Sequence, residues 1–288
     1  MEIISTIKFL REAVSNAKTQ GKTIGLVPTM GALHAGHVSL INRAREECDF
    51  VIVSIFINPT QFNNKNDFLT YPQTVEADCE KLIECGVDIA FVPSVEEIYP
   101  EPDTRTFELG EVAEVMEGKM RPGHFNGVAQ IVSKLFDYCL PDRAYFGEKD
   151  FQQIAVIKKM SELIGFKGKI VECPICREVD GLAMSSRNMR LNADQRMKAP
   201  VIYETLSAAA DLANQGIDIP SIRELVETEI NNVDGMEVEY FDIVDADTLR
   251  EIESWDQSGP KGAIGCIAVW LGDVRLIDNI KFSKHHDC

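Results

Sequence analysis

The stretch Ile24-Gly-Leu-Val-Pro-Thr-Met-Gly-Ala-Leu-His-Ala-Gly-His37 joins an apolar run, a glycine-containing turn and the start of a helical pattern. We predict a buried strand at Ile24–Val27 and a helix from His37 to about Cys48. A second run, Val51–Ile57, is apolar and rich in β-branched residues, which is typical of a parallel strand covered on both faces. Strand, helix and strand in this order predict an α/β arrangement.

The same alternation continues up to residue 173. Alternating strands and helices predict a Rossmann-like, doubly wound parallel sheet with helices on both faces. The predicted elements are a helix at Val75–Cys85, a strand at Asp88–Val92, a helix at Phe125–Cys139, a strand at Arg143–Phe146, a helix at Phe151–Ile164 and a strand at Lys169–Cys173.

The pattern changes after residue 176. A long Ala-rich helix is predicted at Ala193–Asn214 and a second helix at Pro220–Asn231. Three strand-like runs without intervening helices then indicate an antiparallel sheet: Glu237–Val244, Ala263–Leu271 and Val274–Ile280. We therefore predict two domains, a Rossmann-like one over residues 1–175 and a smaller α+β lid domain over residues 176–288.

Composition places the chain among globular proteins and limits its partners. The 288 residues are 45% hydrophobic, which allows a substantial core and excludes global disorder. The net charge of −17 speaks against a general nucleic-acid binder and against an anionic membrane surface, but not against a small anionic substrate. We see neither a signal peptide nor an apolar run near the roughly 20 residues of a membrane helix, and predict a cytoplasmic protein.

Eight cysteines are scattered along the chain, and reduced thiols are the expectation without a secretion signal. Cys173-Pro-Ile-Cys176 has the spacing of a zinc or redox pair, but no second pair follows. We interpret it as two incidental cysteines near a strand end. His285-His286 is interpreted as part of a frayed terminus rather than a metal site.

The turn after the first strand carries the densest chemical signal. Gly31 and Gly36 have P-loop spacing, but His37-Val38 stands where Lys and Ser or Thr are required, so a P-loop is excluded. His34 and His37 lie three residues apart at a helix start, where free N–H groups attract phosphate. Imidazoles there can donate to phosphate oxygens as charge develops.

Two further motifs offer groups for an anionic substrate. Asn58-Pro-Thr-Gln61 follows the second strand and offers neutral donors and acceptors, although turn formation explains it equally well. Arg121-Pro-Gly-His124 resembles an anion clamp before a helix, and a solvated loop is an equal alternative.

Two later motifs suit a nucleotide. Gly147-Glu-Lys149-Asp150 follows a strand and offers a cation for phosphate and a carboxylate for a ribose hydroxyl, or simply a charged helix start. Met184-Ser-Ser-Arg187, near the predicted domain boundary, suits a loop that closes over polyphosphate, with a helix cap as the plain alternative.

His34-Ala-Gly-His37 resembles the HxGH signature of the nucleotidyltransferase superfamily, and Met184-Ser-Ser-Arg187 resembles its second signature. The five motifs that begin at Pro28, Asn58, Arg121, Gly147 and Asp180 occur here in one order. Together they make residues 28–191 of the chain similar to the pantothenate synthetase (pantoate–β-alanine ligase) family. The resemblance implies that (R)-pantoate and ATP form pantoyl-adenylate and pyrophosphate, and that β-alanine then gives pantothenate and AMP. It also implies Mg²⁺ with the ATP and a homodimer.

The resemblance also implies roles for individual residues. His37, His34 and Lys149 would act in catalysis, with Lys149 on the α-phosphate and Asp150 near the ribose. Gln61 and Gln153 would bind pantoate, Gln61 would also border the β-alanine site, and Asp78 is a weak metal candidate. The implied ATP-binding set is Met30, Gly31, Ala32, Leu33, His34, Ala35, Gly36, His37, Gly147, Glu148, Lys149, Asp150, Cys176, Met184, Ser185, Ser186 and Arg187.

Two alternatives remain open at this stage. One is a nucleotidyltransferase that acts on a phosphate-bearing substrate, against which Gln61, Gln153 and the Arg121 block favour a carboxylate. The other is a non-catalytic nucleotide sensor or a tRNA-binding relic of a synthetase. The net charge speaks against tRNA, and the intact histidine pair speaks against lost catalysis.

Overall fold

The computed structural model describes residues 1–282, so the predicted fraying of His285-His286 lies outside the described residues. The chain forms two compact units. The first comprises Met1–Ala113, Gly118–Glu148 and Gln152–Pro174. The second comprises Glu114–Glu117, Lys149–Phe151 and the chain from Ile175 onward. Two short internal segments thus belong to the second unit.

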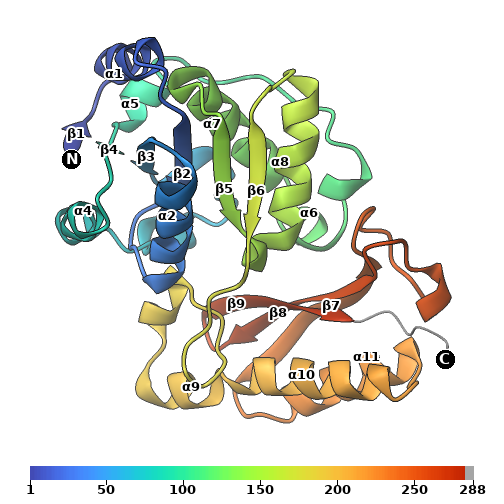
Figure 1. The fold of residues 1–288 in the computed structure, drawn as a ribbon. Coiled ribbons are helices and arrows are strands. Elements are labelled where there is room, and N and C mark those ends of the chain that lie inside the picture. The colour runs from blue at the N-terminus through green and yellow to red at the C-terminus, as the bar shows by residue number, and fades with distance from the viewer. Residues whose placement is uncertain (283–288) are drawn as a thin grey trace. The chain divides into compact units, whose positions relative to one another are not determined.

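The first unit contains a six-stranded sheet whose order is β1-β4-β3-β2-β5-β6 and whose neighbours all pair in parallel. The predicted doubly wound parallel sheet is confirmed (Figure 1). The strands are β1 (Glu2–Ile4), β2 (Ile24–Thr29), β3 (Phe50–Ile55), β4 (Ile89–Phe91), β5 (Arg143–Gly147) and β6 (Lys169–Cys173).

Successive residues of a strand point to opposite faces of the sheet, and both faces are covered here. Leu26 of β2 packs in a core with the helices α1, α7 and α8, whereas its neighbour Val27 packs in a second core with α2 and α4. The helices are α1 (Ile7–Thr19), α2 (Ala35–Glu47), α3 (Lys65–Leu69), α4 (Val75–Glu84), α5 (Val95–Ile98), α6 (Met116–Met120), α7 (His124–Cys139) and α8 (Phe151–Leu163), and the unit boundary crosses α6 and the first residue of α8.

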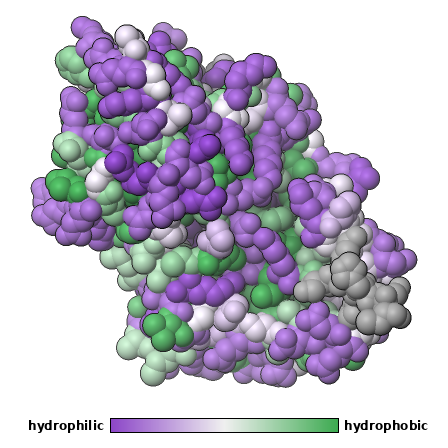
Figure 2. Space-filling model, in the orientation of Figure 1, coloured by the Kyte–Doolittle hydropathy of each residue, from purple (hydrophilic) through white to green (hydrophobic). Residues whose placement is uncertain are grey.

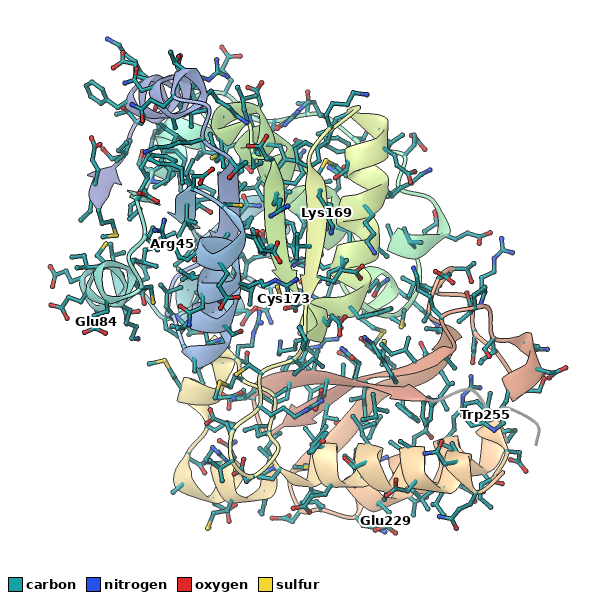
Figure 3. The ribbon with its side chains drawn as sticks, in the orientation of Figure 1. Arg45, Glu84, Lys169, Cys173, Glu229 and Trp255 are labelled. Carbon is teal, nitrogen blue, oxygen red and sulfur yellow. The ribbon has the colours of Figure 1, made fainter. Side chains whose placement is uncertain are left out.

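The order of the strands fixes where a ligand can bind. From β2 the chain moves outward through β3 and β4 in one direction, and β5 and β6 extend the sheet in the other. The carboxyl ends of β2 and β5 therefore flank the point where the strand order reverses, which is where open α/β sheets bind ligands. Figure 3 labels Lys169 and Cys173 at the two ends of β6, and the Cys173 end marks the carboxyl edge.

The second unit has a three-stranded antiparallel sheet in the order β7-β8-β9 (Figure 1). The predicted C-terminal antiparallel sheet is confirmed. Its strands are β7 (Met236–Asp245), β8 (Ala263–Leu271) and β9 (Val274–Phe282), and its helices are α9 (Ala193–Lys198), α10 (Val201–Asn214) and α11 (Ile219–Asn231).

One predicted helix is wrong in the second unit. The structure divides the predicted Ala193–Asn214 helix into α9 and α10, with a break at Ala199-Pro200. Proline has no N–H to donate to the carbonyl four residues earlier, and its ring crowds the preceding turn. Pro200 therefore starts the second helix instead of continuing the first. No element was predicted at the positions of β1 and α1.

The surface and the thiols fit the composition. Figure 2 shows a largely hydrophilic face with scattered hydrophobic residues. The seven cysteines within the described part of the chain are free thiols. None of the helices found in residues 1–282 is long and apolar enough to cross a membrane.

A segment without regular structure, residues 99–110, is anchored to α7 by polar contacts. Gln130 donates from Nε2 to the carbonyls of Asp103 and Arg105 at 2.9 and 2.8 Å. The Asp103 carboxylate accepts from the Arg105 guanidinium at 2.6 Å, and this ion pair lowers the pKa of Asp103 to about 2. An acid with a depressed pKa stabilises the folded state above its unfolded pKa.

We expect Asp103→Asn to lower the free energy of unfolding by about 1 kcal/mol at neutral pH, a value discounted for the half-exposed Arg105. The difference from the parent should shrink as the pH falls from about 4 toward 2, because the parent's carboxylate then becomes protonated. Urea unfolding at several pH values measures this. Glu101→Gln, an exposed charge loss on the same segment, is the control. A deficit independent of pH would contradict the assignment.

Candidate active site

The two histidines of the first turn form the amino-terminal cap of α2. His34 Nδ1 accepts from the Gly36 N–H at 3.1 Å, and His37 Nδ1 accepts from the His34 N–H at 3.3 Å. A backbone N–H can only donate, so each Nδ1 must be unprotonated and each neutral ring carries its proton on Nε2. The ring centroids are 4.0 Å apart. The cap thus fixes two neighbouring imidazoles in the tautomer whose Nε2–H can donate to a phosphate oxygen.

The turn before this cap is conformationally strained and is held by one buried carboxylate. Gly31 and Ala32 have φ of 83° and 49°, and a left-handed alanine costs about 1–3 kcal/mol. Asp78, fully buried on α4, accepts from the N–H groups of Ala32 at 2.8 Å and Leu33 at 2.7 Å. A Cβ on Gly31 would lie 3.1 Å from Asp78 Oδ2. Asp78 therefore stabilises the path of the chain between β2 and α2.

Gln61 contacts the same turn. It lies in the short 3-10 helix Pro59–Gln61, is buried, and donates from Nε2 to Met30 Sδ at 3.0 Å. Asn58 Nδ2 donates to Gln61 Oε1 at 3.1 Å, which fixes the amide so that its NH₂ group faces Met30. Tyr99 in turn donates to Asn58 Oδ1 at 2.8 Å. A member of the predicted pantoate site thus contacts a member of the predicted ATP loop.

His124 contacts Gln61 and Arg121 as a neutral imidazole. Its Nδ1 lies 2.8 Å from the Gln61 carbonyl oxygen, and its Nε2 lies 3.2 Å from Arg121 Nη1. A carbonyl can only accept and a guanidinium can only donate, so His124 is protonated on Nδ1 alone. The predicted anion clamp therefore contains one cation, Arg121, while buried His124 connects Arg121 to the backbone of Gln61.

Gly127 of α7 allows the helix to pack directly on the Gln61 turn. A Cβ at this position would lie 2.4 Å from the Thr60 carbonyl oxygen and 2.7 Å from the Gln61 nitrogen. Asn58 also donates to the Gly127 carbonyl at 3.0 Å. Any larger residue would displace the turn that carries Gln61.

Other predicted residues of the first unit follow β5. Gly147 ends this strand, and Glu148 begins the short 3-10 turn after it. Gln153 is in the first turn of α8. Gly147 and Gln153 are therefore close in sequence to the carboxyl end of the strand that, with β2, flanks the reversal of strand order.

The remaining predicted residues belong to the second unit. Lys149 Nζ lies 3.7 Å from Asp150 Oδ1, and the Lys149 side chain is only 15% exposed. Met184 donates its N–H to the Cys176 carbonyl at 3.0 Å. Ser185 Oγ accepts from the Arg187 N–H at 3.3 Å and caps the 3-10 helix Ser186–Arg190. The capping role considered for this loop is therefore present.

Comparisons with known proteins identify the family of this chain. A family model described as pantoate-beta-alanine ligase matches residues 2–281. This chain belongs to the pantoate–β-alanine ligase family. A pantothenate synthetase of Porphyromonas gingivalis is 56% identical over 98% of this chain and 99% of its own length. One of Bacteroides fragilis is 54% identical over 99% of this chain and all of its own length.

Solved structures of pantoate–β-alanine ligases have the same fold. Pantothenate synthetase of Thermus thermophilus superposes with a TM-score of 0.91 and 42% identity, covering 98% of this chain and 99% of that one. The ligase of Francisella tularensis, solved with β-γ ATP and β-alanine, gives 0.82 and 37%, covering 98% and 97%. These matches confirm the predicted family across the chain.

Several residues that contact the Gln61 turn were not among the predicted site residues. The sequence motif indicated Asn58 only as a donor and acceptor, and it gave no indication of Tyr99 or Gly127. Their contacts to the Gln61 turn span up to 69 residues of sequence, and local patterns carry no record of such distances. Lys81, whose Nζ donates to the Leu33 carbonyl at 2.6 Å, was missed for the same reason.

Asp78 was predicted as a weak metal candidate. Both of its oxygens accept backbone N–H groups, and within residues 1–282 no three His, Cys, Asp or Glu side chains are arranged to share a metal ion. Mg²⁺ commonly uses substrate phosphates and water with one or two carboxylates. The contacts of Asp78 favour a role in holding the turn.

We expect Asp78→Asn to reduce ligase activity by about 10²-fold, because one amide NH₂ would face a backbone N–H and the turn would move. The Mg²⁺ concentration for half-maximal activity should stay unchanged. Steady-state rates over a Mg²⁺ titration measure both. Asp67→Asn, an acid outside the turn, is the control. Recovery of activity at high Mg²⁺ would show instead that Asp78 binds the metal.

Proposed function

We infer that this protein condenses (R)-pantoate with β-alanine at the expense of ATP, through a pantoyl-adenylate, and releases pyrophosphate and AMP. The family membership of the whole chain supports the reaction. The observation that carries the assignment of residues is the cap of α2, where two imidazoles are fixed as Nε2–H donors beside the reversal of strand order.

In the first step a pantoate carboxylate oxygen attacks the α-phosphorus of ATP. A new P–O bond forms, the bond to the β-phosphate breaks, and pyrophosphate leaves with the electron pair. Two anions must approach each other, so donors fixed before the reaction lower the barrier most. We assign this role to His34 and His37, with Lys149 contributing an ammonium to the α-phosphate.

The pantoate site is assigned to Gln61 and Gln153. The Gln61 NH₂ group is oriented by Asn58, and an amide donor suits a carboxylate or hydroxyl without adding charge. Among the predicted cations, Arg121 is connected to this turn through His124, which contacts both Arg121 and Gln61. Asp150 is assigned to the ribose, and Met184 to Arg187 to the phosphates.

In the second step the neutral amine of β-alanine attacks the acyl carbon of the adenylate. A C–N bond forms, the C–O bond to the phosphate breaks, and AMP leaves as the anion while the nitrogen loses a proton. Because β-alanine attacks the carbon of the former pantoate carboxyl, we assign Gln61 to the β-alanine site as well. Desolvation of the adenylate also limits its hydrolysis.

Three further features belong to this proposal. Mg²⁺ bound with ATP would supply positive charge beside its phosphates. The enzyme works as a homodimer in the cytoplasm, a compartment that suits the free thiols of the described chain. The relatives are bacterial pantothenate synthetases, which supports the setting.

The proposed reaction predicts that AMP forms steadily only when both pantoate and β-alanine are present with ATP. Pyrophosphate should also appear with pantoate alone, in a burst limited by the amount of enzyme. Quantifying both products by chromatography tests this. Pyrophosphate release with a phosphorylated acceptor, and none with pantoate, would instead show a nucleotidyltransferase with another substrate.

We expect His37→Asn to lower the adenylation rate by about 10²–10³-fold with little effect on the melting temperature. The Asn side-chain oxygen can replace Nδ1 as the cap acceptor, but the Nε2–H donor is lost. His37→Gln, whose amide nitrogen falls near the position of Nε2, is the matched variant and should retain more activity. Equal rates for the parent and His37→Asn would contradict the assigned role.

Gln153→Ala is expected to raise the KM for pantoate while the KM for ATP changes little, because an amide on pantoate contributes to its binding alone. Loss of one neutral hydrogen bond corresponds to about 0.5–1.5 kcal/mol, or roughly 2- to 13-fold in KM. Initial rates at varied pantoate and varied ATP measure the two constants. An unchanged pantoate KM would refute the assignment.

A further inference from the structure

Two consecutive residues of β9, Asp278 and Asn279, connect the two phosphate-directed segments of the second unit. Asn279 donates from Nδ2 to the carbonyl oxygen of Lys149 at 3.1 Å and is 4% exposed. The short segment Lys149–Phe151 belongs to this unit although the chain on either side of it belongs to the first. The Asn279 amide therefore holds the backbone of the residue assigned to the α-phosphate.

Asp278 holds the second segment through an arginine. It accepts two hydrogen bonds from Arg177, at 2.6 Å from Nη1 and 3.0 Å from Nη2, and its side chain is 3% exposed. The Arg177 guanidinium also lies 3.9 Å above the Tyr203 ring and donates to the Gly181 carbonyl at 3.1 Å. A paired, stacked guanidinium of this kind has one allowed position.

Arg177 begins a tight hairpin that leads directly into the Met184–Arg187 loop. Arg177 and Ala183 form an antiparallel bridge, and the Glu178 N–H donates to the Leu182 carbonyl at 2.8 Å. After the hairpin, Asn188 Nδ2 donates back to the Ala183 carbonyl at 3.0 Å. Fixing Arg177 therefore fixes the base of the loop.

The two connections are joined at the strand itself. Asp278 Oδ1 accepts the N–H of Asn279 at 2.7 Å, and Arg177 Nη2 lies 3.3 Å from the Asn279 carbonyl oxygen. Burial raises the pKa of Asp278, and the positive charges of Arg177 and Lys149 oppose that shift. A buried ion pair contributes little net stability compared with apolar residues of the same size. The contacts of this pair therefore indicate that it contributes by holding Arg177 and Asn279 in fixed positions.

We propose that Asp278 and Asn279 are positioning residues for adenylation, which keep Lys149 and the Met184–Arg187 loop in one phosphate-binding arrangement. The inference rests on the function proposed above. Asp278 acts through Arg177 on the loop, and Asn279 acts through the Lys149 backbone. Neither touches a substrate. ATP brings several negative charges, and a fixed spacing between the Lys149 ammonium and the loop lets both act on them together.

The test measures pantoate-dependent pyrophosphate formation in a single turnover, together with the KM values for ATP and β-alanine. Asp278→Asn and Asn279→Ala should each slow adenylation or raise the ATP KM, by up to about 10²-fold in rate over KM. The β-alanine KM should stay unchanged. Asp245→Asn, an equally buried carboxylate of the same unit that caps a turn at Thr248, is the matched control and should leave ATP use unaltered.

A cycle with Lys149→Ala separates positioning from general support. Asn279→Ala should add little to the loss already caused by Lys149→Ala, because it acts through that residue, whereas Asp278→Asn should still reduce the rate. If Asp278→Asn does not fold, the double variant Arg177→Gln/Asp278→Asn replaces it, because that variant removes both buried charges. The result for Asn279→Ala then decides the inference by itself.

Three results would overturn the inference. They are unchanged ATP use in both variants, equal losses in the ATP and β-alanine constants accompanied by a lower melting temperature, and a full, multiplicative loss when Asn279→Ala is added to Lys149→Ala. Absence of pantoate-dependent pyrophosphate from the parent protein would count against the proposed function instead, because it does not involve the variants.

Discussion

The pair of hydrogen bonds from the Asp78 carboxylate to the Ala32 and Leu33 amides is the contact on which the first unit's site depends. The chain must leave β2 and enter α2 within five residues, and it does so through two successive left-handed positions. An alanine does not hold that conformation unaided. A fully buried acid that accepts both amides offsets the strain and fixes the angle at which α2 begins.

Because α2 begins at a fixed angle, the N–H groups at its amino-terminal end can select the tautomer of two histidines. The amides of His34 and Gly36 donate to the ring Nδ1 atoms, and both Nε2 atoms must then carry a proton in the neutral rings. The same reasoning makes His124 a neutral Nδ1–H donor between Arg121 and Gln61. His124 thus carries its proton on the other ring nitrogen from His34 and His37, because its fixed hydrogen-bond partners differ from theirs. These rings can donate hydrogen bonds without carrying a charge.

Local patterns in the sequence were sufficient for the alternation of strands and helices. Apolar runs such as Val51–Ile57 and the glycine-containing turn before His37 are local signals, and the structure has strands and turns there. The prediction of one long helix at Ala193–Asn214 was wrong, because it rested on the alanine content and Pro200 interrupts the helix. β1 has three residues, too few for a period to show.

The site was predictable where its residues are contiguous and not where they meet through the fold. Met30 to His37 and Met184 to Arg187 are single blocks, so a motif can identify them. The contacts of Asp78 with Leu33 span 45 residues, and those of Arg177 with Asp278 span 101. A carboxylate alone in a helix pattern does not show whether it will face a metal, water or an amide. Asp78 was therefore assigned to a metal by analogy.

The acidity of the chain and its anionic substrates are compatible because the recognition described here depends little on net charge. A net charge of −17 repels an approaching nucleotide, but screening over about 8 Å at physiological salt removes most of the effect of distant carboxylates. In the proposed site, amide N–H groups, imidazole Nε2–H groups and the Gln61 amide act beside the Lys149 ammonium, and each of these neutral donors is fixed by its neighbours. Arg275 illustrates the opposite use of charge, since it lies between Glu117 and Glu239 in the second unit and its cation is fully paired there. Cations paired with carboxylates, such as Arg275, hold the second unit together, whereas the proposed ligand site combines neutral donors of fixed orientation with the ammonium of Lys149.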